Sequence, residues 1–570
     1  MTVRKTRRRR VVTLKYGTFD AHEVVRQQNT RDQSRSIPSS ELARLVAPGC
    51  RYGYDLVAHV GLESFLHGRR LEEIQQNLQE GQPSIPLPTS SLDELRRRFL
   101  FYLGQVHRQA APLLKESLHQ PEGMTWLIDG TLEPGTAVFF GVQHARSGIL
   151  LACSKIPTEN ADDIAPCLKE TANDYGRPKR ILHDLSSAMS LACQTALGDV
   201  PHDVCHFHFA CDVGEDLLSK PQKALSGRLR SLKLQVRMRE QRKTQTEWLR
   251  EHQGEGEAAL ILQQLLRGEP FVGTWNETLG KEVLLALHFW MLDYAADGGR
   301  QGFPFDPYFL YFHRRLLRGH DALVRLLSRP TVSVHAPKTL FNLRDLLQRY
   351  RNDLQIIATT AHYELAFGEF DRLRTTLRLT AAGNSPMHHG YELDAQHWNQ
   401  VREALDTLAE EYRQRINACS DELERDVCQT ILTHLEKYSG QLVPRDGSHD
   451  SVRTTNQLEG HWSASKRACR QTQGRRKLTR TFNALPAELM LIPNLGNSEY
   501  VRIVLEGCLE HLPRKFAEAN IDGSSYASWR QSNTSLNLGR IPTRILRQPD
   551  FVEHVIEIYD DQCRGKYKAA

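Results

Sequence analysis

The sequence lacks most of the features that mark secreted, membrane-spanning or repeat proteins. Its eleven cysteines are scattered over 570 residues, odd in number and without a Cys-x-x-Cys pair, so we expect reduced thiols. No apolar run reaches the roughly 18–20 residues needed to cross a bilayer. The basic N-terminus, "MTVRKTRRRRVVTLKYG", has no apolar stretch typical of a signal peptide. We find no internal repeat and no low-complexity tract, and we expect a cytoplasmic protein.

The composition is that of a globular protein, with 40% hydrophobic, 25% charged and 8% aromatic residues. The chain exceeds the roughly 100–200 residues of a single domain, so several cores are expected. A net charge of +6 is a mild bias, but the cations are clustered. The segment from Lys220 to Arg250 contains ten Lys and Arg residues and only two acidic residues, Glu240 and Glu247. Such a cluster is either a solvated helix face or the footprint of a nucleic-acid binder.

Hydrophobic periodicity divides the chain into regions of different class. After residue 121 the order is three strands, helix, strand, helix and strand, which is an α/β layer arrangement. Long amphipathic helical patterns follow it. The regions are 1–50, a small basic β-rich or irregular module with a hairpin turning at Gly17; 51–120, helical; 121–215, the first part of an α/β core; 216–450, an all-helical insertion; 451–495, a last core helix; and 496–570, a helical extension.

The helical region 51–120 has the outline of a helix-turn-helix. Two short helical patterns precede a Pro-rich link, and Ser91 with Glu94 has the spacing of a capping box that would start a third helix. Arg96 and Arg97 lie early in that helix, where recognition helices contact the major groove. The alternative is a generic helical bundle.

Two aspartates follow predicted strands. Asp129 closes "TWLID", and Asp184 closes "RILHD". Active groups gather at the carboxyl ends of sheet strands, so neighbouring strands would bring these carboxylates together. Asp129 could instead be a turn aspartate before Gly130, and Asp184 could cap a helix beginning near Ser186.

Glu459 is the candidate for a third carboxylate. Carboxylate oxygens are the ligands that Mg²⁺ prefers, and three carboxylates suit a pair of such ions. Asn456 and Glu459 also have the spacing of a capping box, in which Glu459 would only bind a backbone amide. The residues alone leave both interpretations open.

The order "LIDGT", "ILHDLSSA", "CHFH", a long helical stretch and "TTNQLEGHWSASKR" resembles the DDE transposases of bacterial insertion sequences, in their mutator-like and hAT-like branch. These enzymes have an RNase H-like domain with the first Asp on the first strand, the second just after the fourth strand, and the Glu on a later helix beyond a helical insertion. Here 55 residues separate Asp129 from Asp184, and 275 separate Asp184 from Glu459. Relatives often begin with a zinc ribbon, whereas residues 1–50 contain only Cys50.

The resemblance implies an α/β RNase H-like catalytic domain with a mixed sheet, interrupted by an all-α insertion. Asp129, Asp184 and Glu459 would hold two Mg²⁺ ions, or Mn²⁺, for strand nicking and strand transfer. The implied partner is double-stranded DNA, both terminal inverted repeats and target, bound by a homodimer or larger oligomer in the nucleoid. A domesticated, non-catalytic DNA-binding protein and a two-metal nuclease or resolvase are the alternatives.

"VCHFHFAC" offers Cys205 and His208 at a C-x-x-H spacing. A structural zinc site needs four ligands, no second paired motif lies nearby, and on a strand Cys205 and His206 would point to opposite faces, so no zinc is expected. A nucleophilic dyad lacks an orienting partner. A packed core cluster is one interpretation. The resemblance implies the other, a C-x-x-H motif that borders the active site and contacts DNA.

Aromatic and basic residues surround Glu459. Trp462 lies three residues further on, hence on the same helix side, and could stack on an unpaired base or pack in the core. Several cations would suit phosphate contacts unless they form a solvated face. They are Arg453, Lys466, Arg467, Arg475 and Arg476.

Overall fold

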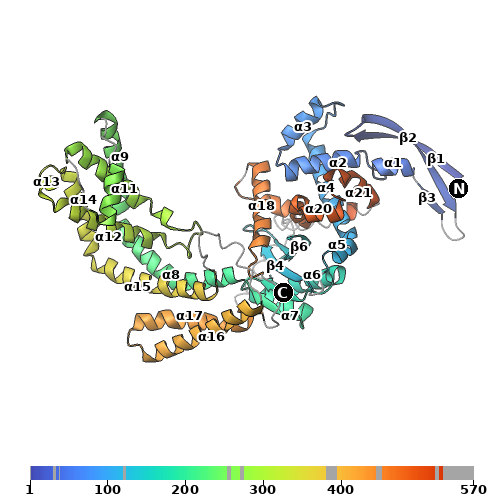
Figure 1. Ribbon diagram of the computed structural model, residues 1–570. Helices are drawn as coiled ribbons and strands as arrows, with labels where there is room; N and C mark the ends of the chain where they lie inside the picture. The colour runs from blue at the N-terminus through green and yellow to red at the C-terminus, as the bar shows by residue number, and fades with distance from the viewer. Residues whose placement is uncertain are drawn as a thin grey trace, which may run out of the picture. The chain divides into compact units, whose positions relative to one another are not determined.

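The computed structural model describes residues 2–29, 34–37, 39–119, 123–252, 258–269, 275–379, 395–444, 452–474, 476–519 and 526–530. The chain forms two compact units, whose elements are labelled in Figure 1. The core unit consists of Met1–His202 and Thr455–Ala570, and the helical unit is Asp203–Thr454. The chain therefore leaves the core unit once and returns to complete it.

A β-hairpin begins the core unit. Strands β1 (Thr2–Thr13) and β2 (Gly17–Asn29) pair antiparallel, and β3 (Ser34–Ile37) adds to β2. Gly17 has a φ of +67°, a backbone conformation that glycine adopts without a Cβ clash. The predicted hairpin and its turn are confirmed. Within it, Arg7 and Arg9 donate to Glu23 at 2.6 and 3.2 Å.

Short helices follow the hairpin, and one long helix is buried among them. From Ser91 to His107, no residue of this helix, α4, is exposed. A recognition helix presents a face to DNA, so this burial favours the generic helical bundle over the predicted helix-turn-helix. The predicted capping box is wrong, because α4 begins at Thr89. The elements are α1 (Ser40–Leu45), α2 (Tyr54–Gly61), the π-helical η1 (Leu62–Leu66), α3 (Leu71–Glu80), α4 (Thr89–Gln109) and α5 (Ala111–Ser117).

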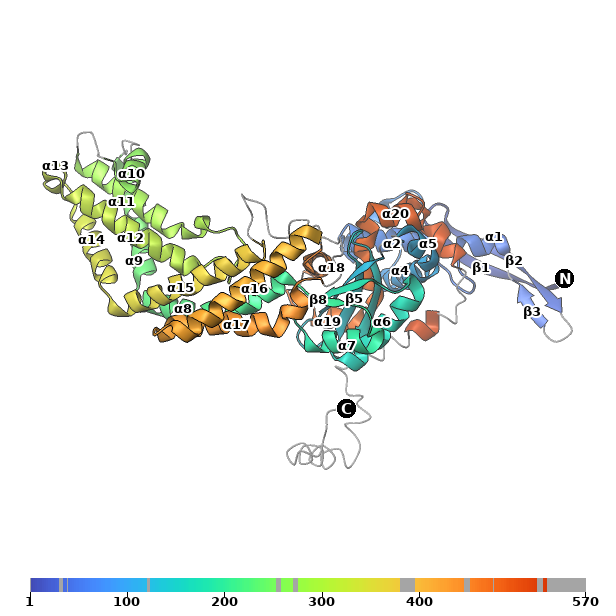
Figure 2. The ribbon, with the colours of Figure 1, turned by 60° about the horizontal axis from the view of Figure 1, so that its bottom comes forward.

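A five-stranded sheet with the order β6–β5–β4–β7–β8 forms the α/β layer. Its strands are β4 (Thr125–Thr131), β5 (Val138–His144), β6 (Leu150–Ile156), β7 (Arg180–His183) and β8 (His202–Val204). β5 pairs antiparallel with β4 and β6, whereas β7 runs parallel to β4, so the sheet is mixed. Helices α6 (Ala161–Tyr175) and α7 (Ser187–Leu197) connect β6 to β7 and β7 to β8 (Figure 2). The predicted α/β class and element order are confirmed.

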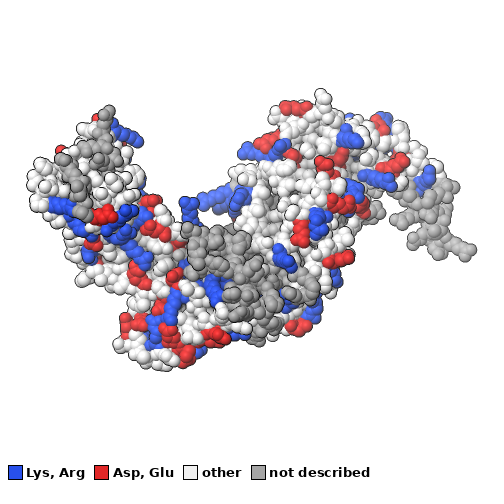
Figure 3. Space-filling model, viewed as in Figure 1, with Lys and Arg blue, Asp and Glu red and all other residues white. Residues whose placement is uncertain are grey.

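The returning segment packs against this sheet. α18 lies on β4, and the 3₁₀ segment η4 lies on β6, where the Asn494 side chain exchanges two 2.9 Å hydrogen bonds with the Leu150 backbone. Lys and Arg gather over α18 and beside α3 (Figure 3). The predicted helix around Glu459 is confirmed, and residues 531–570 lie outside the described residues. The elements are α18 (Asn456–Gln473), α19 (Thr479–Ala484), η4 (Ala487–Gly496), α20 (Ser498–Val504), η5 (Leu509–His511) and α21 (Leu512–Glu518).

In the helical unit, every regular element described after β8 is a helix, as the periodicity predicts. α8 packs along α15, α9 along α11, and α16 along α17. No helix in the described ranges is both long and apolar enough to span a membrane. The elements are α8 (His206–Ser231), α9 (Leu234–His252), α10 (Ala258–Arg267), α11 (Glu277–Leu292), η2 (Tyr294–Asp297), α12 (Tyr308–Leu327), α13 (Pro330–Ser333), α14 (Lys338–Arg351), α15 (Leu354–Thr376), α16 (Ala395–Ala418) and α17 (Glu422–Leu442).

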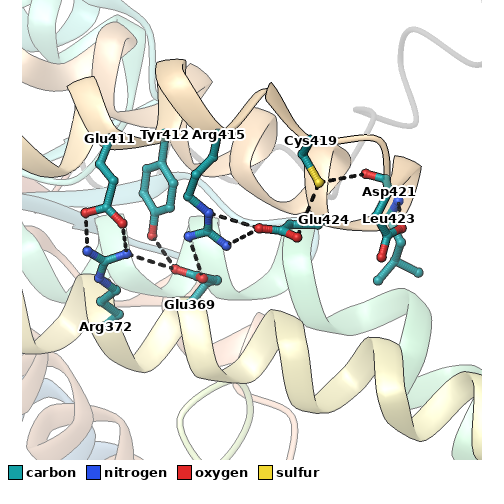
Figure 4. A network of polar contacts seen from close by, with 9 residues as sticks. All are labelled: Glu369, Arg372, Glu411, Tyr412, Arg415, Cys419, Asp421, Leu423 and Glu424. Carbon is teal, nitrogen blue, oxygen red and sulfur yellow. Dashed lines mark hydrogen bonds and ion pairs between the residues drawn. The ribbon is translucent and has the colours of Figure 1, made fainter. Parts of the chain in front are cut away.

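A polar network joins three of these helices (Figure 4). Arg415 of α16 donates to Glu369 of α15 and to Glu424 of α17, both at 2.7 Å. Glu369 also accepts from the Tyr412 hydroxyl at 2.9 Å. Since Glu369 is 12% exposed, its charge is held in place by these donors rather than by solvent.

Candidate active site

Asp129 and Asp184 belong to neighbouring parallel strands. β4 and β7 pair Thr125 with Arg180 and Leu127 with Leu182, an offset of 55 residues. The same offset relates Asp129 to Asp184, so the register carried two residues further sets one carboxylate opposite the other. Adjacent strands lie about 4.7–4.9 Å apart, and matching positions of parallel strands face the same side. The register of the two strands therefore predicts that the two carboxylates lie at the same edge of the sheet, opposite each other.

The structure excludes a turn role for Asp129 and a helix-capping role for Asp184. β4 continues to Thr131, and Asp129 lies inside it, paired with Gly141 of β5 and 8% exposed, so it is not a turn residue. Helix α7 is capped by Ser186, whose hydroxyl accepts from the Met189 amide. Asp184 instead accepts from the Ser186 amide through Oδ1 at 2.8 Å, ahead of the helix.

Glu159 is a further carboxylate at this edge, which the sequence reasoning missed. β6 runs in the direction of β4, because each is antiparallel to β5, so Glu159 follows β6 at the same edge of the sheet. A Cβ built on Gly130 would lie 3.1 Å from Glu159 Oε2. Burial, and then the charge of Asp184, raise the pKa of Glu159, while a hydrogen bond from Ser186 opposes the shift. The available signal was a carboxylate shortly after a predicted strand.

Trp462 anchors α18 to β4 and β5. Its indole Nε1 donates to Asp129 Oδ2 at 2.9 Å. The ring covers Gly141, where a Cβ would come within 2.4 Å of it. Trp462 is 3% exposed, so the prediction that it stacks on a DNA base is wrong and the core-packing alternative holds.

Glu459 lies one helical turn before Trp462, hence on the same side of α18. The N-cap of α18 is Thr455, not Asn456, so the capping box between Asn456 and Glu459 is excluded. The Thr455 hydroxyl lies 3.4 Å from Glu459 Oε1 and donates to it. Glu459 is half-buried beside the helix face that carries the contact to Asp129.

The donor set of this edge is chemically suited to a hard cation. Asp129, Asp184 and Glu459 offer carboxylate oxygens from three elements, and Mg²⁺ and Mn²⁺ prefer such ligands. Across the described residues, no three His, Cys, Asp or Glu side chains form a group that could hold a metal ion as they stand. Asp184 and Glu459 are each engaged by a neighbouring residue of their own segment. The carboxylate oxygens of Asp129, Asp184 and Glu459 therefore suit Mg²⁺ or Mn²⁺. The β4–β7 register places the two aspartates, and the shared helix side with Trp462 places Glu459.

Cations of α18 accompany the carboxylates. Lys466, one turn after Trp462, donates to the Leu132 carbonyl at 2.9 Å. Burial lowers the pKa of Lys466, although the charges of Glu133 and Asp129 oppose the shift. Arg470, a further turn on, donates to Glu133 at 3.1 Å. α18 thus carries positive charge away from Asp129 toward its C-terminal end.

The other predicted phosphate ligands differ in exposure. Arg467 and Arg476 are exposed, and Arg475 lies outside the described residues. Arg453 belongs to the helical unit and is 2% exposed. Its guanidinium donates to the carbonyls of residues 377 and 378 at 2.7 and 3.0 Å, and burial lowers its pKa to about 10. The prediction that Arg453 contacts phosphate is therefore wrong.

Cys205 and His208 also belong to the helical unit, and a helix carries them. β8 ends at Val204, and α8 begins at His206 with Cys205 as its N-cap. The predicted strand across this motif is wrong, and with it the argument from opposite strand faces. Cys205 is fully buried, as the core alternative predicts, whereas His208 is half-buried with its ring edge against Phe207.

Arg96 and Arg97 lie in the N-terminal half of α4. Both donate to Asp93, at 2.5 and 3.3 Å, and Arg97 also donates to the Ala484 carbonyl at 3.3 Å. Their side chains are 14% and 27% exposed, and both line one cavity. They are therefore placed to meet a ligand at that cavity.

No protein-family model matches the sequence, and no curated protein is significantly similar to it. The functional assignment therefore depends on the residues and on the fold.

Proposed function

We propose that the protein is a DDE-type DNA transposase, which nicks and joins DNA strands at the ends of an insertion sequence. The observation that carries this proposal is the parallel register of β4 and β7, which, continued two residues beyond the last pair, sets Asp129 opposite Asp184. In chain order these are the first and fourth strands of the sheet, which supports the RNase H-like arrangement that the resemblance implies. Glu459 follows on a helix beyond the inserted helical unit, which supports the same assignment.

Asp129, Asp184 and Glu459 would hold the Mg²⁺ or Mn²⁺ ions of such an enzyme. When bound, two ions stabilise the attacking and leaving oxygens of an in-line phosphoryl transfer. The indole N–H of Trp462 fixes the orientation of Asp129 through its Oδ2. Glu159 adds negative charge beside Asp184, and the repulsion between these carboxylates favours a cation at this edge.

The charge of α18 supports DNA as the substrate. Lys466, Arg467 and Arg470 follow Trp462 along the helix and suit contacts to backbone phosphates. Such contacts position a duplex without reading its sequence. Terminal repeats, target DNA and an oligomer that pairs two ends belong to the proposal through the resemblance.

Cleavage of the element's own ends tests the proposal. The full-length protein is incubated with duplexes that carry the terminal repeats flanking its gene, with Mg²⁺ or Mn²⁺, and strands are resolved on a denaturing gel. We expect nicked and joined products from the wild type and none from Asp184→Asn. The matched control is Asp199→Asn, because Asp199 is exposed and pairs with Arg177 at the surface. It should retain full activity.

The other outcomes separate the alternatives. Binding of the repeats without cleavage by the wild type favours a domesticated DNA-binding protein. Cleavage without strand joining favours a nuclease or resolvase. Undiminished activity in Asp184→Asn contradicts the role given to this carboxylate.

A further inference from the structure

A cavity of about 760 Å³ lies in the core unit where α3 and α4 approach the C-terminal end of α18. Arginines dominate its lining and come from three separate segments. The charged residues that line it are Arg69, Arg70, Glu72, Arg96, Arg97 and Arg480. Thr472 and Gly474 of the α18 end complete this side of the wall. We call it the arginine cavity.

Its positive charge exceeds what the surrounding carboxylates neutralise. Asp93 binds Arg96 and Arg97, and Glu63 binds Arg69 at 2.5 Å. Counting these two and Glu72 against all five arginines leaves an excess of two positive charges. A concave surface of one sign focuses its field and concentrates anions.

Three of the arginines are accessible from solvent, and one of them, Arg69, pairs with Glu63. The other two are Arg70, at the N-terminus of α3, and Arg480, in α19. Guanidinium groups offer several donors in a planar fork that matches phosphate oxygens. The cavity is therefore suited to a phosphate ligand held by groups from both of its sides.

We infer that the arginine cavity binds the phosphate backbone of duplex DNA at a distance from the carboxylates. Thr472 lies 13 residues beyond Glu459 on the same helix. At 1.5 Å per residue, this is roughly 20 Å along α18. Since successive phosphates of a strand rise about 3.4 Å, this corresponds to about six base pairs.

Between the two sites α18 carries a basic path. Lys466, Arg467 and Arg470 lie on the helix between Glu459 and the cavity. A duplex that meets both sites passes from the side of α18 that carries Glu459 to the side that carries Thr472, because 13 residues turn the helix by about 220°. The binding itself is independent of catalysis, whereas the spacing from the cut rests on the proposed function.

The salt dependence of DNA binding tests the inference. Full-length protein is titrated into a fluorescent duplex of about 40 base pairs in EDTA, at several NaCl concentrations, because the slope of log K against log[salt] counts neutralised phosphates. The test variant is Arg70→Gln/Arg480→Gln. The matched control, Arg44→Gln/Arg502→Gln, removes two exposed arginines outside the cavity.

We expect the test variant to reduce the slope by about two, and to weaken binding roughly tenfold or more at physiological salt. The control should bind within about twofold of the wild type. Both variants should melt like the wild type, because the replaced side chains are exposed. A slope equal to that of the control, or a wild type that binds no duplex, overturns the inference.

A second readout maps the distance. Neutral methylphosphonate linkages about six base pairs from the cleaved bond should weaken binding by the wild type but not by the test variant. If linkages at other positions weaken binding instead, the assigned distance between the cavity and the cleaved bond is wrong. Asp184→Asn should lose cleavage and keep the wild-type salt slope. Loss of the proposed catalysis and loss of the inferred binding are thus separate results.

Discussion

Gly141→Ala places a methyl group where the indole of Trp462 lies. The added Cβ would come within 2.4 and 2.7 Å of Trp462 Cη2 and Cζ2, and within 3.1 Å of Leu150 Cδ1. Both the ring and the β6 side chain are buried, so neither can swing into solvent. The indole must move away from β5. This movement would break its hydrogen bond to Asp129 and loosen α18 on the sheet.

The expected loss of stability in Gly141→Ala follows from two effects. Overpacking a core typically costs about 1–3 kcal/mol. Loss of a hydrogen bond to a charged group costs about 1.5–3 kcal/mol. The two are coupled through one side chain, so we expect a loss of at least about 2 kcal/mol rather than their sum. For a unit of this size, that lowers the melting temperature by roughly 3 °C or more.

The matched control is Gly460→Ala. Gly460 lies in α18 near Trp462, and a Cβ built there has no neighbour within 4 Å. Alanine is favoured over glycine inside a helix by about 0.5–1 kcal/mol, so this variant should melt slightly higher. Scanning calorimetry measures both. A Gly141→Ala protein that melts with the wild type would refute the close packing of Trp462 on β5.

Three further predictions concern stability. Burial lowers the pKa of His107 to about 4. Between pH 6.5 and pH 4 only the unfolded chain takes up the proton, so the free energy of unfolding decreases as the pH is lowered. Between pH 7 and 5 this costs about 2 kcal/mol, and urea unfolding of His107→Gln should show that much less loss. Arg453→Lys should lower the melting temperature and leave DNA affinity unchanged. An unchanged melting temperature with weaker DNA binding would instead support a contact between Arg453 and phosphate. Arg415→Met should destabilise the protein by about 2 kcal/mol in urea unfolding, because Glu369 loses the nearer of its two cationic partners and keeps only Arg372 at 3.8 Å, and an unaltered midpoint would contradict the network.

Local patterns predicted much of the sheet and of the hairpin. "TWLID" and "RILHD" are short apolar runs, and both are buried strands. Gly17 between two β-like runs predicted the turn, because a positive φ suits glycine. The offset between β4 and β7 could not be read from either strand alone. Without it, the placement of Asp129 opposite Asp184 stayed a supposition.

The wrong predictions have physical causes that cannot be read from one short segment of sequence. Arg96 and Arg97 suggested a DNA-facing helix, but the five consecutive residues Phe99 to Leu103 of α4 are all buried, so the helix is apolar and covered on every side there, which is typical of a buried helix. "VCHFHF" alternates in the manner of a strand, yet the apolar residues beyond it repeat at helical spacing. Trp462 packs on Gly141, and no local pattern relates residues so far apart.

The discontinuity of the core unit has a consequence for its synthesis. A ribosome delivers the strands, Asp129 and Asp184 before any part of the helical unit, and α18 only after it. Roughly 250 residues separate these events, which at about 5–20 residues per second is on the order of 10–50 s. Through that interval the nascent sheet lacks Trp462 over Gly141, and apolar surface left uncovered in this way is prone to aggregation. Glu459 emerges last, so a partly made chain does not contain the full set of carboxylates.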